Sequence, residues 1–159
     1  MRITIACVGK VKEAFYRDAC AEYVKRLSRY ARIEFAEVAD EKTPEFASPA
    51  EEDRIRAREG ERLQKVIPAD ACVIVLAIEG RQMDSVTFSR QLDALAVGGT
   101  SHIVFVIGGS LGLSPEVMAL ADRKLSFSAM TFPHQLMRVI LLEQVYRAFR
   151  ISRNEPYHK

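Results

Sequence analysis

Hydrophobic positions along the chain follow two patterns, continuous apolar runs and apolar residues at helical spacing. Short runs of apolar and β-branched residues are typical of strands buried in a parallel sheet, whereas apolar residues three or four positions apart indicate amphipathic helices. The runs predict strands over residues 2–8, 33–38, 71–78, 103–107 and 125–128. The helical spacing predicts helices over residues 12–30, 49–66, 85–96, 114–122 and 135–151.

Local signals at the predicted helix ends agree with this division. Pro49 is followed by three acidic residues, Ser114 stands before Pro115 as a helix cap, and Gly98-Gly99 ends the third helix. Strands that alternate with helices specify an α/β domain. We therefore expect a mainly parallel sheet of about five strands with helices on both faces, the run 71–78 being a central strand, in one domain over residues 1–159.

Composition bounds the class of protein. With 159 residues, 48% of them hydrophobic and 28% charged, the chain is long enough for one well-buried core. The longest apolar run, residues 71–78, is much shorter than the roughly 20 residues that cross a bilayer. The N-terminus has the pattern of a strand and lacks the regions of a signal peptide. We expect a cytoplasmic protein without a membrane segment.

The cysteines do not indicate a disulfide framework or a metal site. Cys7, Cys20 and Cys72 are odd in number, widely spaced and set among apolar or helical residues. The sequence predicts buried free thiols and no metal.

Charge is nearly balanced overall but uneven along the chain. The net charge is +2, while from His134 to the end basic residues outnumber acidic ones by five to two. This excess fits either an RNA-binding surface or a solvated helix face.

The last predicted helix is apolar nearly all round, so it must be covered on nearly all sides. One face can pack on the sheet. A second copy of the protein is the simplest cover for the other face, and burial within the same chain is the alternative.

Candidate ligand-binding loops follow three of the predicted strands. Ligands of open parallel sheets bind outside the carboxyl ends of the strands, and residues 76–80, 107–112 and 127–130 lie at such ends. Apolar walls with exposed backbone groups suit adenine better than phosphate. The turn 108–112 lacks the following lysine of a phosphate-binding loop, and it does not follow the first strand as a dinucleotide fingerprint does. No nucleophile elbow surrounds Ser110.

Three segments together resemble a known family. These are Phe-Val-Ile-Gly-Gly-Ser-Leu-Gly at 105–112, Leu-Ser-Phe-Ser-Ala-Met-Thr-Phe-Pro-His at 125–134, and Pro-Tyr-His-Lys at 156–159, with Cys-Val-Gly-Lys at 7–10 in support. The whole chain resembles the ribosomal RNA large subunit methyltransferase H family, small members of the knotted SPOUT class. That family methylates N3 of a pseudouridine in 23S rRNA with S-adenosylmethionine.

The resemblance implies a cofactor site and an assembly. It places bent S-adenosylmethionine against Leu76, Gly108, Phe127, Ser128, Ala129, Met130, Thr131 and Phe132. It implies a C-terminal trefoil knot, action on assembled ribosomes, and a homodimer in which the tail of one subunit completes the site of the other. At the last basic position, Lys159 stands where arginine is also found, so a point charge replaces a bidentate fork.

Methyl transfer to N3 requires loss of the N3 proton. Histidine, with an ordinary pKa of roughly 6.5, is often neutral near pH 7, so His158 is the candidate for proton handling. Tyr157 is expected to stack on the base or bond to it, and Lys159 to hold phosphate or stabilise the anion. The alternative is that these three residues only order the tail.

Other polar residues near the C-terminus have alternative roles. Arg138 and Arg147 are predicted to bind the RNA backbone, the alternative being an ion pair across a dimer interface, and Arg153 is predicted to bind RNA. His134 is expected either to contact the cofactor or to cap the last helix.

Three other functions remain open at this point. They are a SPOUT methyltransferase for a different RNA, a non-catalytic RNA-binding module, and a different nucleotide-using α/β enzyme. Cofactor binding separates the RNA-binding module from the methyltransferases, and displacement by nucleotides would identify the nucleotide-using enzyme.

Overall fold

A computed structural model describes all residues, 1–159, as one three-layered α/β unit. The strands are β1 (Arg2–Val8), β2 (Arg32–Val38), β3 (Cys72–Arg81), β4 (His102–Ile107) and β5 (Arg123–Leu125). The helices are α1 (Ala14–Leu27), α2 (Pro49–Val66), α3 (Ser85–Val97), α4 (Pro115–Ala119) and α5 (His134–Ser152). The predicted α/β class with five strands is confirmed.

The strands form a single sheet in the order β2-β1-β4-β3-β5, and every paired neighbour is parallel. β4 is therefore the middle strand, and the run 71–78, predicted to be a central strand, forms the inner strand β3, which is paired on both sides. β3 lies between β4 and the short edge strand β5, which leaves its last residues less covered; Ile78 is 51% exposed.

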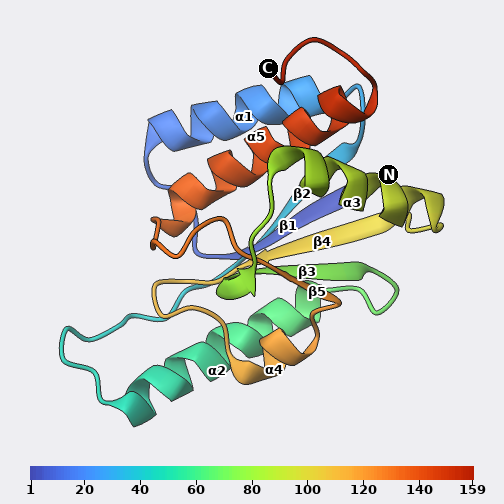
Figure 1. Ribbon diagram of the computed structural model, residues 1–159. Coiled ribbons are helices and arrows are strands. Elements are labelled where there is room, and N and C mark those ends of the chain that lie inside the picture. The colour runs from blue at the N-terminus through green and yellow to red at the C-terminus, as the bar shows by residue number, and fades with distance from the viewer.

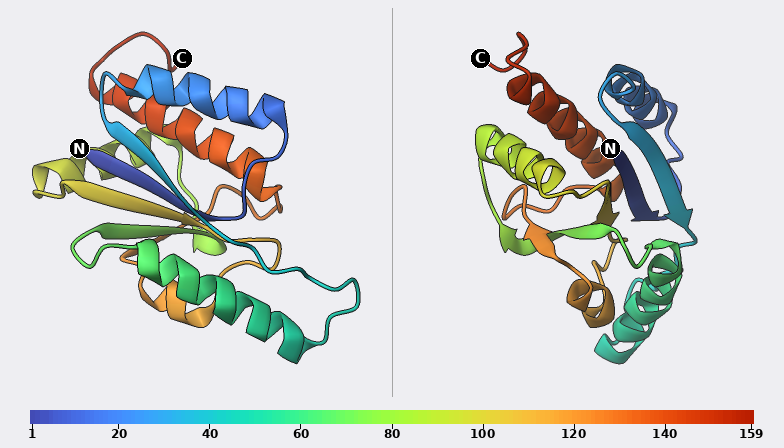
Figure 2. Two further views of the ribbon diagram at one scale, coloured as in Figure 1. Left: turned by 180° about the vertical axis from the view of Figure 1, so that it is seen from behind. Right: turned by 90° about the vertical axis from the view of Figure 1, so that its right-hand side faces the viewer.

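Helices cover both faces of the sheet. Figures 1 and 2 show α1, α3 and α5 on one face and α2 with α4 on the other. Alternate residues of the inner strands point to opposite sides, so Ile3, Ile5 and Phe105 lie in the larger core cluster and Val104 and Val106 in the smaller one. The continuous apolar runs of the sequence arise because both faces of these strands are buried.

Two predicted boundaries move because polar side chains bond to the backbone. α4 ends at Ala119 instead of 122, since Asp122 accepts a hydrogen bond from the Val73 amide at 2.7 Å and so ties the start of β5 to β3. The fifth strand is Arg123–Leu125, and the predicted strand 125–128 was wrong for its last three residues. There Ser126 Oγ donates to the Ser128 carbonyl and bends the chain into a loop.

α5 lies between α1 and α3 over the sheet. Leu141, Leu142 and Val145 are fully buried beneath it. Helices of the same chain thus cover two flanks of α5, and its outward positions remain half-buried. Cover by a second copy stays a prediction.

All three cysteines are free, as predicted; Cys7 and Cys20 are buried and Cys72 is half-buried. Burial raises the pKa of the Cys7 thiol to about 12, so the thiol stays protonated and unreactive. No helix has the length and apolar character needed to cross a membrane. No group of three or more potential ligand side chains is placed to hold a metal ion.

Candidate functional site

A cavity of about 410 Å³ opens at the carboxyl ends of β3, β4 and β5, and we call it the carboxyl-edge cavity. The loops that follow these three strands form its walls, as the sequence predicted. Its lining consists of residues 76–79, 107–113, 125–128 and 130–132, with Met118 from α4 and His134 and Met137 from α5.

Glycines shape this cavity because backbone segments approach each other too closely for side chains. A Cβ on Gly108 would lie 2.8 Å from the carbonyl carbon of Gly112, and one on Gly80 would lie 2.7 Å from that of Leu125. Gly112 itself has φ +82, in the left-handed region that favours glycine. The Gly-rich segment therefore folds back on itself beside β4, and the end of β3 presses against the end of β5.

The chemistry of the lining selects against phosphate ligands. Most lining residues are hydrophobic, and none is lysine or arginine; Glu79 is the sole acidic residue. A phosphate group needs cationic or concentrated N–H partners, whereas a flat purine needs apolar walls and a few edge hydrogen bonds. Within the loop, Ser128 Oγ accepts a hydrogen bond from the Met130 amide at 2.9 Å, which fixes part of the wall.

The start of α5 closes one side of the cavity. His134 is the first residue of the helix, Pro133 stands at the cap position, and no side chain caps this end. His134 therefore lines the cavity and does not cap the helix. Burial, and next the positive charge of Arg138, lower the pKa of its imidazole below the ordinary value, so the neutral form is favoured.

Arg138 is placed where it cannot serve the RNA-binding role predicted for it. The side chain is 1% exposed. Its guanidinium donates to the Gly9 carbonyl at 2.7 Å and to the Val8 carbonyl at 3.3 Å, and it pairs with Glu37 at 3.0 Å. Arg138 instead links the end of β1 to α5, because the helix turns this position inward, and its burial does not fit the predicted RNA contact.

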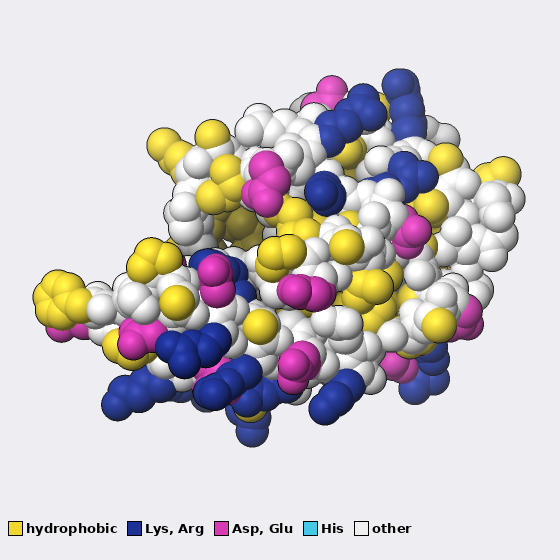
Figure 3. All heavy atoms as spheres, turned by 90° about the horizontal axis from the view of Figure 1, so that it is seen from below, with side chains coloured by type: hydrophobic (Ala, Val, Ile, Leu, Met, Phe, Trp, Pro, Cys, Tyr) yellow, Lys and Arg dark blue, Asp and Glu magenta, His cyan; other side chains and the backbone are white.

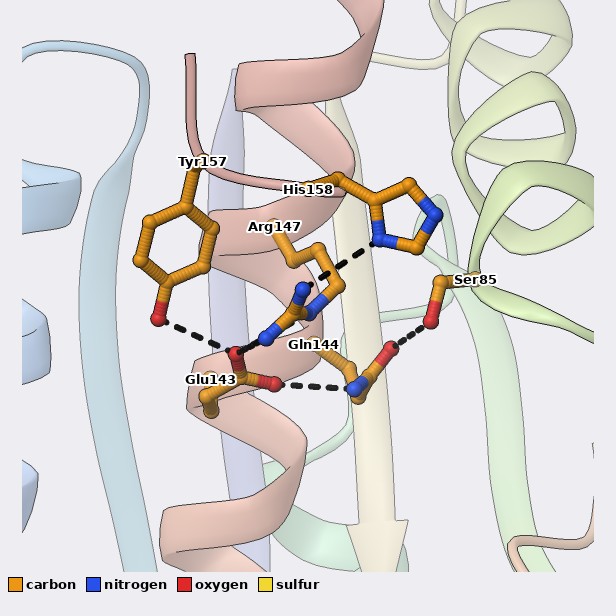
Figure 4. A network of polar contacts seen from close by, with 6 residues as sticks. All are labelled: Ser85, Glu143, Gln144, Arg147, Tyr157 and His158. Carbon is orange, nitrogen blue, oxygen red and sulfur yellow. Dashed lines mark hydrogen bonds and ion pairs between the residues drawn. The ribbon is translucent and has the colours of Figure 1, made fainter.

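The C-terminal tail folds back along α5 and is held there by a network of polar contacts (Figure 4). Tyr157 donates to Oε1 of Glu143 at 3.1 Å, and Arg147 Nε donates to the same oxygen at 3.0 Å. Nη1 of Arg147 lies 3.2 Å from Nδ1 of His158. Burial, hydrogen bonding to Tyr23 and the neighbouring Glu143 raise the pKa of Tyr157 to about 12, so its hydroxyl remains a donor.

Arg147 thus forms an ion pair within its own helix, and neither predicted role for it is seen in the single chain. Arg153 stacks its guanidinium 4.9 Å from the centre of the Tyr30 ring and remains exposed, and Lys159 is exposed without an ion-pair partner. These two side chains stay accessible to a polyanion.

The tail does not line the carboxyl-edge cavity of its own chain. Tyr157 contacts Glu143, nine residues along α5 from His134, which corresponds to about 14 Å at a rise of about 1.5 Å per residue. His158 lies at a second hollow of about 460 Å³, whose wall of residues 125–127 is shared with the cavity. Within one chain, the predicted proton acceptor therefore lies outside the carboxyl-edge cavity, although it lines a hollow together with Phe127 of a predicted cofactor loop.

Of the eight residues predicted to hold a cofactor, seven line the cavity, and Ala129 does not. Sequence reasoning did not assign Met118, Leu113 or Met137 to the site. Met118 and Met137 lie on helices that follow the ligand-binding loops directly.

Comparison with known proteins gives concordant results. A family model described as "Predicted SPOUT methyltransferase" matches residues 1–158. A protein of Bifidobacterium adolescentis named "Ribosomal RNA large subunit methyltransferase H" is 60% identical over 159 residues, covering all of both chains. A protein of Methanococcus maripaludis, named "Putative ribosomal RNA large subunit methyltransferase H", is 54% identical over the same full length.

A solved structure shares the fold at low sequence identity. It is a probable methylase family protein from Haemophilus influenzae, with a TM-score of 0.56 and 15% identity, and the match covers 99% of this chain and 70% of that one. At this identity the likeness concerns the fold alone.

Proposed function

The chain belongs to the SPOUT methyltransferase family, and from that premise we propose that it methylates N3 of a pseudouridine in 23S ribosomal RNA with S-adenosylmethionine as the methyl donor. Relatives that are 54–60% identical over their full length carry the name of ribosomal RNA large subunit methyltransferase H. A ribosomal substrate also implies a place in the cytoplasm.

The observation that carries the proposal is the carboxyl-edge cavity. Its volume of about 410 Å³ lies within the usual range for small-molecule sites, about 300–1,000 Å³. Its apolar walls and lack of cationic side chains suit an adenosine that bears no phosphate, and they argue against a nucleotide-using enzyme of another kind. The residues present therefore fit S-adenosylmethionine.

We assign the donor to the residues that the resemblance names and that line the cavity, Leu76, Gly108, Phe127, Ser128, Met130, Thr131 and Phe132. When bound, S-adenosylmethionine supplies a methyl group made electrophilic by its sulfonium. The close approaches at Gly80 and Gly108 support the trefoil knot expected of this family, since segments that cross tightly need glycine between them.

The contribution of the chain itself is orientation and proton handling. Transfer to N3 forms a carbon–nitrogen bond while the bond from the methyl carbon to sulfur breaks, so most of the rate comes from alignment. The N3 proton must pass to a base, and His158 is assigned that role, with the Tyr157 hydroxyl as a hydrogen-bond donor. The Glu143–Arg147 pair holds this tail in place.

A homodimer would bring the tail into a cavity. The tail of a single chain does not line its own cavity, so we propose that it completes the site of a second copy, as the resemblance implies. The half-buried apolar face of α5 is available for such a contact.

Transfer of a radiolabelled methyl group tests the proposal. Ribosomes that lack the modification are incubated with the protein and labelled S-adenosylmethionine, and the RNA is digested to nucleosides. Label in N3-methylpseudouridine is the expected result. Label in another nucleoside would favour a different RNA target, and absence of donor binding would favour a non-catalytic RNA-binding module.

A further inference from the structure

The turn between β1 and α1, residues 9–13, lies beside the carboxyl-edge cavity. Figures 1 and 2 both show it next to the start of α5. A Cβ on Gly9 would lie 3.7 Å from Nε2 of His134, which lines the cavity. Side chains that project from this turn therefore stand at the rim where a substrate strand must arrive.

Hydrogen bonds fix this turn at both ends. Gly9 has φ +80, its amide donates to the Val38 carbonyl at 2.8 Å, and its carbonyl accepts from Arg138 at 2.7 Å. At the other end, Arg17 Nη1 donates to the Lys12 carbonyl at 2.6 Å. The backbone is thus held by groups that leave the side chains of residues 10–13 free.

Lys10 and Lys12 are exposed, and neither ammonium group has an ion-pair or hydrogen-bond partner. Phe15 follows at the start of α1 and is 65% exposed, with its ring 4.4 Å from that of Tyr16. The acidic residues nearby are Glu13, Asp18 and Asp40, and the basic ones are Lys10, Lys12 and Arg17.

The face formed by α2 and α4 is different. Figure 3 shows lysine and arginine side chains there with acidic side chains between them. Several of those arginines are bound in ion pairs, Arg56 with Asp53 at 2.5 Å and Arg62 with Glu41 at 2.7 Å. Several arginines of that face are therefore paired with acids, whereas the two lysines of the turn have no such partner.

We propose that Lys10 and Lys12 bind backbone phosphates of the RNA strand that enters the site, and that Phe15 offers a stacking face for one of its bases. The assignment rests on the proposed function, because it takes RNA as the substrate. A point charge on a flexible stem suits contact with phosphate, and an exposed ring next to such charges is the arrangement that single-stranded RNA recognition uses. Two rigidly based lysines would set the direction in which the strand approaches the methyl donor.

The test is a comparison of two double variants of the full-length protein. Lys10→Ala with Lys12→Ala removes the turn's charges, and Lys25→Ala with Lys65→Ala removes the same charge from exposed, unpaired positions on α1 and α2. Binding to ribosomes that lack the modification is measured over a range of salt concentrations, together with the KM for ribosomes, the KM for S-adenosylmethionine and kcat.

We expect the turn variant to bind ribosomes roughly tenfold more weakly and to lose about 1.5 from the slope of log affinity against log salt, since each phosphate contact contributes about 0.7–0.9. Its KM for ribosomes should rise, with its KM for the donor and its kcat little changed. The control variant should match the unaltered protein. An unchanged slope and KM in the turn variant would overturn the proposal, as would an equal loss in the control.

Phe15 is tested separately by Phe15→Leu, which keeps an apolar side chain and removes the aromatic face. Weaker ribosome binding, with the sedimentation of the protein unchanged, supports stacking. A change of oligomeric state without a change in binding would place Phe15 at a contact between copies and overturn its assignment. If the unaltered protein transfers no methyl group, the proposed function fails, and the salt dependence of binding still decides the role of the turn.

Discussion

Both edges of the sheet have glycines with left-handed backbone, but only the carboxyl edge also needs glycine where backbone segments approach closely. At the amino edge, Gly99 lies in the α3–β4 turn with φ +89, and nothing lies within 4 Å of the position a Cβ would take. At the carboxyl edge, Gly80 and Gly108 have ordinary φ angles, but a Cβ on either would lie within 2.8 Å of another backbone segment. Gly99 is needed for its local backbone conformation. Gly80 and Gly108 are needed because another backbone segment lies against them, Leu125 in the first case and Gly112 in the second.

This difference teaches where function resides. Connections at the amino edge close through short-range backbone bonds, such as those from Tyr30 to Leu27 and from Ala71 to Pro68. Loops at the carboxyl edge instead enclose the cavity. Substitutions at the amino edge should change stability alone, whereas those at the carboxyl edge should change ligand binding as well.

The largest expected effect comes from removing residues 156–159, which tests whether the carboxyl edge is sufficient by itself. Methyl transfer should fall by at least about 100-fold, the usual contribution of a positioned general base. Donor affinity, measured by calorimetry, should hardly change, because the tail does not line the cavity. His158→Ala is the milder companion. Full activity in the truncated protein would refute the catalytic assignment of the tail.

Adding a methyl group to one glycine at each edge tests directly whether the two edges differ. Gly108→Ala forces Cβ against Gly112, and we expect a loss of about 3 kcal/mol in unfolding free energy with loss of donor binding. Gly99→Ala, the matched control, meets no atoms and should cost about 1–2 kcal/mol through its left-handed backbone, with donor binding retained. Denaturant titration and calorimetry measure both. Equal effects on donor binding would remove the distinction between the edges.

Arg138→Met asks whether the β1 side of the carboxyl edge depends on the buried guanidinium. The Val8 and Gly9 carbonyls lose their donor and Glu37 its partner, so we expect a loss of about 2–3 kcal/mol. Donor binding should also weaken, because His134 and Met137 adjoin this residue on α5. Arg138→Lys should restore part of both. A stable variant with full donor affinity would contradict the role of Arg138 as a tie between β1 and α5.

The smallest effect concerns Glu59, which is 4% exposed beneath Gly109 and accepts a hydrogen bond from the Glu41 amide at 3.1 Å. Burial raises the pKa of its carboxyl above the ordinary value. The folded state therefore binds this proton more readily than the unfolded state, and the contribution of Glu59 to stability falls as pH rises from about 4.5 through the raised pKa. Glu59→Gln should remove that decline. An identical pH profile of the melting temperature in both proteins would show that Glu59 carries no such linkage.

Much of the fold followed from local patterns. Pro49 at the first helical position and the Ser114 cap are formed as predicted, whereas the capping box of Ser48 and Glu51 was not predicted. The convergence of three strand ends into one cavity also followed, because parallel strands carry their carboxyl ends to the same edge.

Tertiary contacts account for what the sequence patterns missed. The residues near Arg138 in the sequence do not predict its contacts with Glu37 and the Gly9 carbonyl, since those partners lie about 100 residues or more away in the chain. The end of the fifth strand was misplaced because Ser126 forms a hydrogen bond within its own loop. The spacing of apolar residues does not reveal such a bond. The separation of His158 from the cavity likewise depends on how the tail folds back on α5.

The position of α5 has a consequence for how the protein is made. Its contacts join the last helix of the chain to α1 and α3, and α1 is the first helix to leave the ribosome. Because synthesis runs from the N-terminus, the flank of α1 that faces α5 lacks its native partner until residues 134–152 have been made. Such late, long-range closure favours slow folding and exposes nascent chains to aggregation. A messenger truncated before α5 should therefore yield a product that is cleared by proteolysis and never accumulates as a smaller folded domain.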